Sequence, residues 1–274
     1  MVPEIGGAFF QPMVRGIEAG ARELGFDLLI HTTRMSRPDN TPWRRLAEHN
    51  TDGLLVFTDG LGTAEMARLQ SIGFPVVLLH RTPPKALAIS CVTIENQAGA
   101  RNIIDHLITI HGHRRIAILQ GQVENEDSMW REKGYREALD AHGLPFDPSL
   151  VARGGFDQEE SMDAVQRWLA GNVAFDAIFA SDDSSAVGAI LALRQAGKRV
   201  PEDIAVVGFD DSQLARSVIP PLTTVRAPTE QVGLEGVRQL VKLIHGEQAE
   251  ARVTLPTKLV IRQSCGCQDS NSQG

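Results

Sequence analysis

Short runs of consecutive apolar residues alternate along the chain with longer stretches in which apolar residues recur every three or four positions. The short runs predict strands, and most of them are apolar throughout rather than at every second position. Strands of that kind are covered on both faces. The expected strands are 27–31, 53–57, 75–80, 91–94, 115–119, 177–180, 205–209 and 259–262.

The longer stretches predict amphipathic helices. Their expected bounds are 13–24, 96–110, 131–142, 159–170, 184–196 and 230–245. Several are followed by a glycine in the position expected after a helix, namely Gly25, Gly112, Gly143, Gly171 and Gly197. Because strands and helices alternate, we predict an α/β protein with parallel, doubly wound sheets. The elements are too many for one sheet, so we expect two lobes.

The composition narrows the class of protein. The chain has 274 residues, of which 42% are hydrophobic and 22% charged, as in globular proteins with a sizeable core. Three cysteines do not make a disulfide framework, and the start of the chain lacks the pattern of a signal peptide, so a cytoplasmic protein is expected. No apolar run approaches the roughly 18 residues of a membrane span. The net charge of −7 argues against a surface that grips nucleic acid.

Polar residues follow several of the expected strands. His80, Asp182 and Asp210 stand at strand ends, and the loop after 115–119 leads to Arg131. In an open parallel sheet the ligand crevice lies beyond the carboxyl ends of the strands. Carboxylates, a guanidinium and an imidazole, together with the aromatic Phe9, Phe10 and Phe156, suit a polyol such as a sugar. The alternative for Asp182 is a helix N-cap without a ligand.

Enzyme and metal chemistry find less support in the same residues. Asp182 and Asp183 are sequential, so their side chains diverge in an extended backbone and make a poor acid–base pair. The segment 60–65, GLGTAE, opens a helix after a strand, but Glu65 replaces the third glycine of a dinucleotide loop. His111-Gly112-His113 is typical of a solvated turn, and Cys265-x-Cys267 lacks a second ligand pair. We therefore predict no catalytic residues, no metal and no cofactor.

Several longer segments resemble one known family. They are AFFQPMVRGIEAGARELGFDLLIHTT, TDGLLVF, FPVVLLHR, HGHRRIAILQG, REKGYREALDAHGL, DAIFASDDSSAVGAILALRQAGKRVPEDIAVVGFDD and PPLTTVRAPTEQVG, with RQSCGC near the end. In order and spacing they are similar to the effector-binding core of the LacI/GalR family of bacterial transcription regulators, over nearly the whole chain. The resemblance implies a periplasmic-binding-protein-like fold of type I, with three crossovers between two lobes and a ligand cleft between them.

The resemblance also implies which residues bind the ligand. They are Phe9, Phe10, Gln11, His80, Arg131, Phe156, Asp182, Ser184 and Asp210. The family often has Asp where this chain has His80, and Asn-Asp where it has Asp182-Asp183. An imidazole can donate or accept a hydrogen bond and titrates near neutral pH, so the effector need not be a neutral hexose.

The organisation of the molecule follows from the same resemblance. The expected lobes are 1–94 with 226–248 and 95–225 with 249–267, and the tail 268–274 is expected to be disordered. A homodimer is expected, and operator DNA would be bound only through a helix-turn-helix headpiece that precedes this core in the family. MVPEIGGAFF matches the end of the first strand and its loop, so we expect a truncated chain that binds effector but not operator. The alternative is a secreted sugar-binding protein of a transporter, for which the RQSCGC ending is not needed.

Overall fold

The computed structural model describes residues 7, 9–32, 48–57 and 60–268 of the chain. The chain forms two compact units, unit 1 (1–94 with 228–256) and unit 2 (95–227 with 257–274), and passes between them three times. None of the helices in the described part combines the length and apolar character that a membrane crossing requires.

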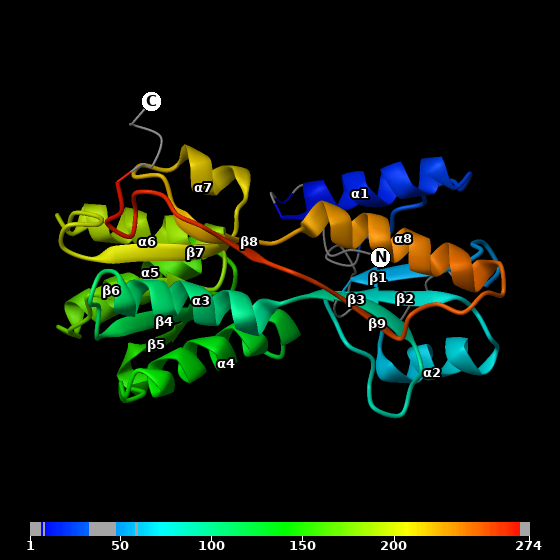
Figure 1. Cartoon of the computed structure of the whole chain (residues 1–274), viewed down its shortest axis with the longest axis horizontal. Coiled ribbons are helices and arrows are strands. Elements are labelled where there is room, and N and C mark those ends of the chain that lie inside the picture. The colour runs from blue at the N-terminus through cyan, green and yellow to red at the C-terminus, as the bar shows by residue number, and fades with distance from the viewer. Residues whose placement is uncertain (1–6, 8, 33–47, 58–59, 269–274) are drawn as a thin grey trace, which may run out of the picture. The chain divides into compact units, whose positions relative to one another are not determined.

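Unit 1 contains a parallel sheet in the order β1-β2-β3-β9. Its elements are α1 (Phe10–Glu23), β1 (Leu54–Phe57), α2 (Thr63–Ser71), β2 (Val76–Leu79), β3 (Ser90–Ile94), α8 (Thr229–Ile244) and β9 (Arg252–Leu255). Alternate strand residues, such as Leu54 and Val76, form one core with Met66 and Leu69 of α2. The pair of helices α1 and α8 covers the other face (Figure 1).

Glycines allow α1 and α8 to pack with their backbones close together. A Cβ atom on Gly16 of α1 would lie 2.0 Å from the carbonyl oxygen of Glu230, and one on Gly233 of α8 would lie 2.3 Å from that of Met13. Because each distance is far below van der Waals contact, no larger residue fits at either position. The crossing places the start of α1, with the aromatic Phe9 and Phe10 beside it, at one end of the sheet.

Unit 2 contains a sheet of six strands in the order β10-β8-β7-β6-β4-β5, in which only the β10 edge is antiparallel. Its elements are α3 (Asn96–Thr109), β4 (Ile116–Gln120), α4 (Glu126–Ala141), a short 3-10 helix (Pro148–Leu150), β5 (Val151–Arg153), α5 (Gln158–Ala170), β6 (Ala177–Ala180), α6 (Asp183–Gln195), β7 (Ala205–Asp210), α7 (Gln213–Ser217), β8 (Thr223–Arg226) and β10 (Lys258–Val260). Helices cover both of its faces.

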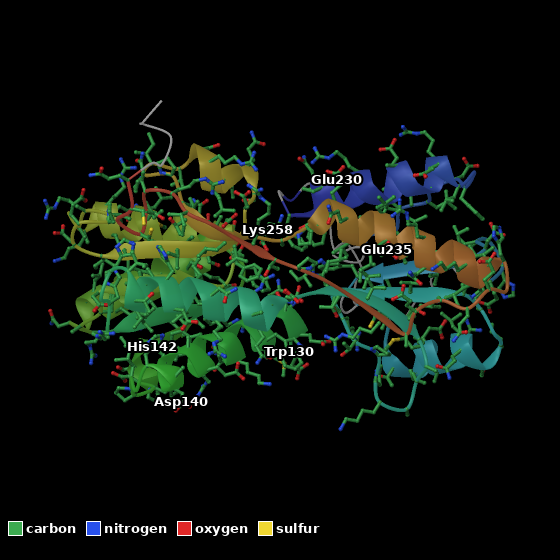
Figure 2. All side chains as sticks on the ribbon, viewed as in Figure 1. Trp130, Asp140, His142, Glu230, Glu235 and Lys258 are labelled. Atoms are coloured by element: carbon green, nitrogen blue, oxygen red, sulfur yellow. The ribbon has the colours of Figure 1, made fainter. Side chains whose placement is uncertain are left out.

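The continuously apolar strands of unit 2 explain this layering. Ala117, Ile178 and Val206 form a core with α5 and α6, and the strand residues between them face the paired α3 and α4. Tyr135 of α4 is fully buried on that side and donates a hydrogen bond of 2.8 Å to the carbonyl of Ile116. At the far end of α4, His142 Nε2 lies 2.9 Å from Asp105 Oδ1 of α3 (Figure 2). Because β5, β4, β6, β7 and β8 are parallel, their carboxyl ends all lie at the same end of the sheet.

The structure confirms most of the expected elements and corrects some. Seven expected strands and all six helices are present with bounds shifted by a few residues. The elements β5, β8, β9 and α7 were not expected, and α2 was foreseen only as a helix that opens at segment 60–65. The predicted strand 27–31 is wrong: in the part of the chain that the structure describes, these residues pair with no neighbouring strand, and residues 26–30 line a hollow together with Leu54 and Leu55 of β1. Gly171 follows α5 as expected, but its φ of −79° is not the left-handed conformation that a glycine often takes after a helix. The next residue, Asn172, takes that conformation instead (φ 52°).

The expected lobe boundaries also need correction. The second boundary lies at 227/228 rather than 225/226, and the third at 256/257 rather than 248/249. The third differs because Arg252–Leu255 pairs with Ser90–Ile94 and so belongs to unit 1. The start of the chain, expected to end a first strand, lies largely outside the described residues, as does the expected disordered tail beyond residue 268.

Candidate functional site

Arg131 is the centre of a buried polar group in unit 2. It follows Trp130 near the start of α4 (Figure 2), a helix capped by the Asn125 side chain, and is only 2% exposed. Its Nε donates to Asn96 Oδ1 at 2.8 Å and its Nη1 to the carbonyl of Ser181 at 2.5 Å. Its guanidinium carbon lies 3.8 Å from the centroid of the Phe209 ring. The stacking and the hydrogen bonds fix the direction of the guanidinium.

Two buried carboxylates face this cation. Arg131 Nη2 lies 3.4 Å from Asp210 Oδ1 and 3.9 Å from Asp127 Oδ2. Asn96 Nδ2 donates to Asp127 Oδ1 at 2.7 Å, so Asn96 bridges Arg131 and Asp127. We call Asn96, Asp127, Arg131, Ser181 and Asp210 the Arg131 cluster. A buried cation of this kind is tolerable because carboxylates and carbonyls surround it.

Asp182 and Asp183 stand beside the cluster but have different partners. Asp182 caps α6, and its side chain accepts from the backbone N–H groups of Ser184 and Ser185 at 3.2 and 3.0 Å. Asp183 accepts from the Thr224 hydroxyl at 2.6 Å and from the Ser212 N–H at 2.7 Å. Asp182 is therefore the N-cap of α6, as one of the two interpretations of the sequence predicted.

Burial governs the protonation of these carboxyls. Desolvation raises the pKa of Asp182, and it raises the pKa of Asp183 to about 7. Desolvation also raises the pKa of Asp210 well above its ordinary value, against the opposing charge of Arg131. The Asp183 carboxyl is therefore protonated in part of the population near neutral pH, and a protonated carboxyl can donate as well as accept a hydrogen bond.

Two buried oxygen atoms at the ends of β6 and β7 lack hydrogen bonds within the described part of the chain. They are Ser181 Oγ and Asp210 Oδ1. Asp210 Oδ1 has only the ion-pair contact with Arg131. Buried polar groups in native proteins almost always find a partner, so these atoms indicate a place for a polar ligand or water.

An aromatic side chain borders the same group. Phe156 follows β5, and the Arg131 guanidinium carbon lies 5.9 Å from its ring centroid. A Cβ atom on Gly121, just after β4, would lie 2.1 Å from this ring, so a glycine is needed there. Phe156, His80 and Asp210 all have positive φ (61°, 56° and 112°). Such backbone strain in non-glycine residues concentrates at functional sites.

The expected residues of unit 1 form a separate aromatic group. His80 directly follows β2 and is fully buried. Its ring centroid lies 5.4 Å from that of Phe9 and 5.5 Å from that of Phe57, and the rings of Phe10 and Phe57 lie 5.0 Å apart. Gln11, in the first turn of α1, is exposed. We call Phe9, Phe10, Phe57 and His80 the aromatic group of unit 1.

The structure thus brings the predicted residues together within each unit. Arg131, Phe156, Asp182, Ser184 and Asp210 gather at the strand ends of unit 2, and Phe9, Phe10 and His80 gather in unit 1, with Gln11 nearby. Sequence reasoning missed Asn96, Asp127 and Phe57. Phe57 is the last residue of the predicted strand 53–57, and Asn96 follows the predicted strand 91–94 by two residues. These positions were the signal that could have found them.

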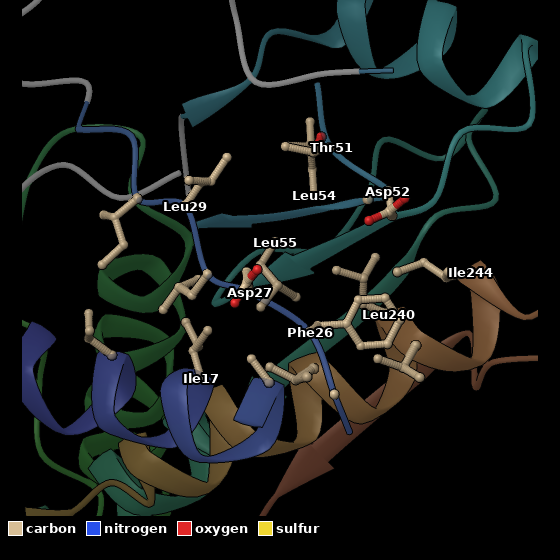
Figure 3. A pocket seen from close by; sticks show the side chains of 18 of the residues that line it. Ile17, Phe26, Asp27, Leu29, Thr51, Asp52, Leu54, Leu55, Leu240 and Ile244 are labelled. Carbon is tan, nitrogen blue, oxygen red and sulfur yellow. The ribbon is translucent and has the colours of Figure 1, made fainter. Parts of the chain in front are cut away.

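One hollow of unit 1 lies away from these residues. Its volume is about 550 Å³, and it opens between the segment Phe26–Ile30, β1, α1 and α8 (Figure 3). Its lining is mainly apolar, and Asp27 and Asp52 are its charged residues. Leu28, Leu29 and Ile30 are 36%, 59% and 41% exposed. None of the predicted ligand-binding residues lines it.

Comparisons with known proteins identify the family. The profile of the periplasmic binding protein-like domain matches residues 104–265. The HTH-type transcriptional regulator CelR of Thermobifida fusca is 36% identical over 260 residues, which cover 93% of this chain and 76% of CelR. The chain belongs to the LacI family of transcriptional regulators. Another relative, the regulator DegA of Bacillus subtilis, is 32% identical over 96% of this chain and 79% of its own.

Solved structures of the LacI family agree with this assignment. A complex of CelR with cellobiose has a TM-score of 0.83 and 34% identity, over 95% of this chain and 80% of that one. A LacI-family regulator from Enterococcus faecium with bound ribose has a TM-score of 0.84 and 25% identity, over 96% and 97%. The chain is therefore the effector-binding core of a LacI-family regulator, and its named relatives are regulators rather than enzymes.

Proposed function

We propose that this chain senses a sugar or sugar derivative that binds both the Arg131 cluster and the aromatic group of unit 1. Asp182, Asp210 and Arg131 would hold hydroxyl groups, Ser184 would add a further donor, and Phe156 would lie against a C–H face. Phe9, Phe10, Gln11 and His80 would contact the ligand from unit 1. The observation that carries the proposal is the set of buried, unsatisfied oxygens at the ends of β6 and β7.

The named relatives support the chemical class. One solved structure is a complex with cellobiose and another contains ribose. Both are polyols, and carboxylates with a guanidinium are suited to the paired donors and acceptors that adjacent hydroxyls present. Protonated carboxyls among the raised groups would donate to ring or hydroxyl oxygens of the sugar.

Regulation would follow from a ligand that touches two units. Such a ligand binds more tightly to the arrangement in which both sets of contacts form, and only this difference in affinity can shift an equilibrium between arrangements. In a homodimer with a helix-turn-helix headpiece on each chain, that shift would change the fit to two operator half-sites. Operator would then change effector affinity by the same factor.

Isothermal titration calorimetry with the purified chain tests the proposal. Cellobiose and ribose are the first probes, followed by other mono- and disaccharides and sugar acids. We expect one of these to bind, and the Asp210→Asn variant to bind it about 5- to 150-fold more weakly, which corresponds to 1–3 kcal/mol for a lost charged partner. Asp163→Asn, an exposed aspartate of α5, is the matched control and should bind as the wild type does.

Two results would contradict the proposal. If every sugar fails to bind while a purine or another class binds, the effector class is wrong. If Asp210→Asn binds the sugar with unchanged affinity, the ligand lies elsewhere, and the hollow of unit 1 becomes the next site to test.

A further inference from the structure

Four potential metal ligands converge in unit 2, away from the Arg131 cluster. His106 lies in the last turn of α3, His111 follows the end of that helix, and Cys265 and Cys267 belong to the segment after β10. One ligand atom of each of these four side chains lies within 4.8 Å of the others. In the sequence the histidines and the cysteines are more than 150 residues apart. The fold supplies the second ligand pair that the Cys265-x-Cys267 motif lacks on its own.

The distances between ligand atoms match a tetrahedral zinc site. With Zn–S near 2.3 Å and Zn–N near 2.0–2.1 Å, the edge from sulfur to nitrogen of a tetrahedron is about 3.6 Å. His106 Nε2 lies 3.6 Å from Cys265 Sγ and 3.7 Å from Cys267 Sγ, and His111 Nε2 lies 3.3 Å from Cys267 Sγ. Three of the four sulfur–nitrogen edges are therefore within about 0.3 Å of the expected value.

The segment that carries the cysteines is held in place by its neighbours. Ser264 is fully buried, its hydroxyl donates to the carbonyl of Val206 at 2.6 Å, and it accepts from the Thr223 N–H at 2.8 Å. Gly266 has φ 103°, a conformation that favours glycine, and this turn lets both cysteines face the histidines. The Thr223 hydroxyl lies 3.1 Å from Cys265 Sγ and 3.0 Å from the carbonyl of Arg262, and it can donate its one proton to either acceptor. An outer hydrogen bond of this kind orients a metal-bound sulfur.

We propose that His106, His111, Cys265 and Cys267 bind one Zn²⁺ ion and so fasten the C-terminal segment to α3. Four protein ligands leave no open position, which is the arrangement of a structural rather than a catalytic zinc. Two sulfurs with two imidazoles select Zn²⁺ over Mg²⁺ or Ca²⁺, which prefer oxygen.

The main alternative is that the thiols and imidazoles only hydrogen-bond to one another. Cys265 Sγ also lies 3.5 Å from the carbonyl of Arg262, a contact that suits a thiol. In that case no ion is needed, and an oxidant would join the two cysteines of the Cys265-Gly266-Cys267 segment. Thiol reactivity and metal content separate the two cases.

The experiment starts from the purified chain, stripped with a chelator under reducing conditions and titrated with Co²⁺ and then Zn²⁺. We expect one equivalent of Co²⁺ with the thiolate-to-metal charge-transfer absorption and the strong visible bands of a tetrahedral site, and displacement of Co²⁺ by Zn²⁺. Zn²⁺ should also raise the melting temperature and slow alkylation of Cys267, measured by mass spectrometry of the digested chain.

Matched variants locate the ion. Cys267→Ser and His111→Asn should each lose the tight equivalent of metal and the rise in melting temperature, and Cys267→Ser should also lose most of the charge-transfer absorption. Both side chains are only partly buried, so the variants are expected to fold, which circular dichroism checks. His49→Gln changes an exposed histidine outside the site, and Cys91→Ser changes the one cysteine outside it, so both should keep the equivalent.

The proposal is overturned if the reduced wild type binds no metal, or if Cys267→Ser and His111→Asn bind Co²⁺ with unchanged affinity and spectrum. It is also overturned if Zn²⁺ leaves the alkylation rate of Cys267 unchanged. None of these outcomes depends on the effector, so they leave the proposed sugar site untouched.

Discussion

Among single residues, Arg131 has two roles, and any substitution of it would remove both. It faces the candidate ligand site, and it is the cation that neutralises the buried Asp127 and Asp210. Its removal would leave those carboxylates uncompensated, and loss of one partner from a buried pair costs about 3–5 kcal/mol. Asp210→Asn keeps the shape of the side chain and the arginine, which makes it the cleaner probe of ligand binding.

Asp183 predicts how stability depends on pH. Its pKa is about 7 in the native state, against about 3.9 for an aspartate in an unfolded chain. Between these values the native state holds the proton more tightly, so its contribution is present at low pH and is lost as pH rises towards 7. From pH 5 to pH 7 we expect Asp183 alone to lower the free energy of unfolding by about 2 kcal/mol. Asp182 and Asp210, whose pKa values are also raised, change the free energy in the same direction.

Urea unfolding at pH 5, 6 and 7 measures this slope. Asp183→Asn cannot titrate, so its free energy of unfolding should depend less steeply on pH. The difference from the wild type should correspond to about one proton fewer released on unfolding. The exposed Asp163→Asn variant should retain the full slope. Equal slopes in all three proteins would show that Asp183 titrates normally.

Gly121 predicts a loss of ligand affinity without direct contact. A methyl group there would collide with the Phe156 ring, which would have to move. If Phe156 lies against the sugar, Gly121→Ala should weaken binding about as much as Phe156→Ala, and the double variant should lose little more. Calorimetric titration with the sugar found above measures all three. Additive losses would show that Gly121 acts through another neighbour.

The sequence could predict the residues at strand ends because topology alone brings them to one edge of a sheet. Arg131 and Asp210 were found in this way, although they are 79 residues apart. Asn96 also lies near a strand end and could have been noticed. Asp127 could not, because its role depends on a hydrogen bond between two helices, α3 and α4. The cluster of His106, His111, Cys265 and Cys267 was missed for the same reason, since its halves meet only after folding.

At the scale of elements, α6 shows how one side chain serves both fold and site. Asp182 accepts two backbone N–H groups at its start, and such a cap contributes about 0.5–2 kcal/mol. Asp182→Ala should therefore lower the free energy of unfolding by that amount. Asp182→Asn retains a capping oxygen and should stay close to the wild type in stability, which urea unfolding compares directly. Under the proposed function, both should bind the sugar more weakly.

The sequence predicted a strand correctly where its run of apolar residues matches a strand that is buried in the fold. Continuous apolar runs such as 177–180 match a buried strand to the residue. The short β5 and the exposed, alternating β9 gave no such signal, since their burial is only partial. The segment 27–31 had a strand's composition, yet the described structure places it beside a hollow instead of a neighbouring strand.

At the scale of the whole molecule, each unit has a core of its own. Met66 and Leu69 belong to one core in unit 1, and Trp168 and Ile190 to another in unit 2. We therefore expect differential scanning calorimetry of the chain without ligand to show two transitions. A sugar that contacts both units should raise both and bring them closer together. A single transition without ligand, with equal calorimetric and van't Hoff enthalpies, would show that the two units unfold as one.

The hollow of unit 1 affects how such melting curves should be recorded. Fluorescent dyes that brighten in apolar surroundings report unfolding only if the native protein offers them nowhere to bind. An accessible apolar hollow of about 550 Å³ would hold such a dye while the chain is still folded. The fluorescence would then start high, and a dye-based screen would record release from unit 1 in place of melting. Circular dichroism, which needs no added reporter, follows the backbone of both units without this interference.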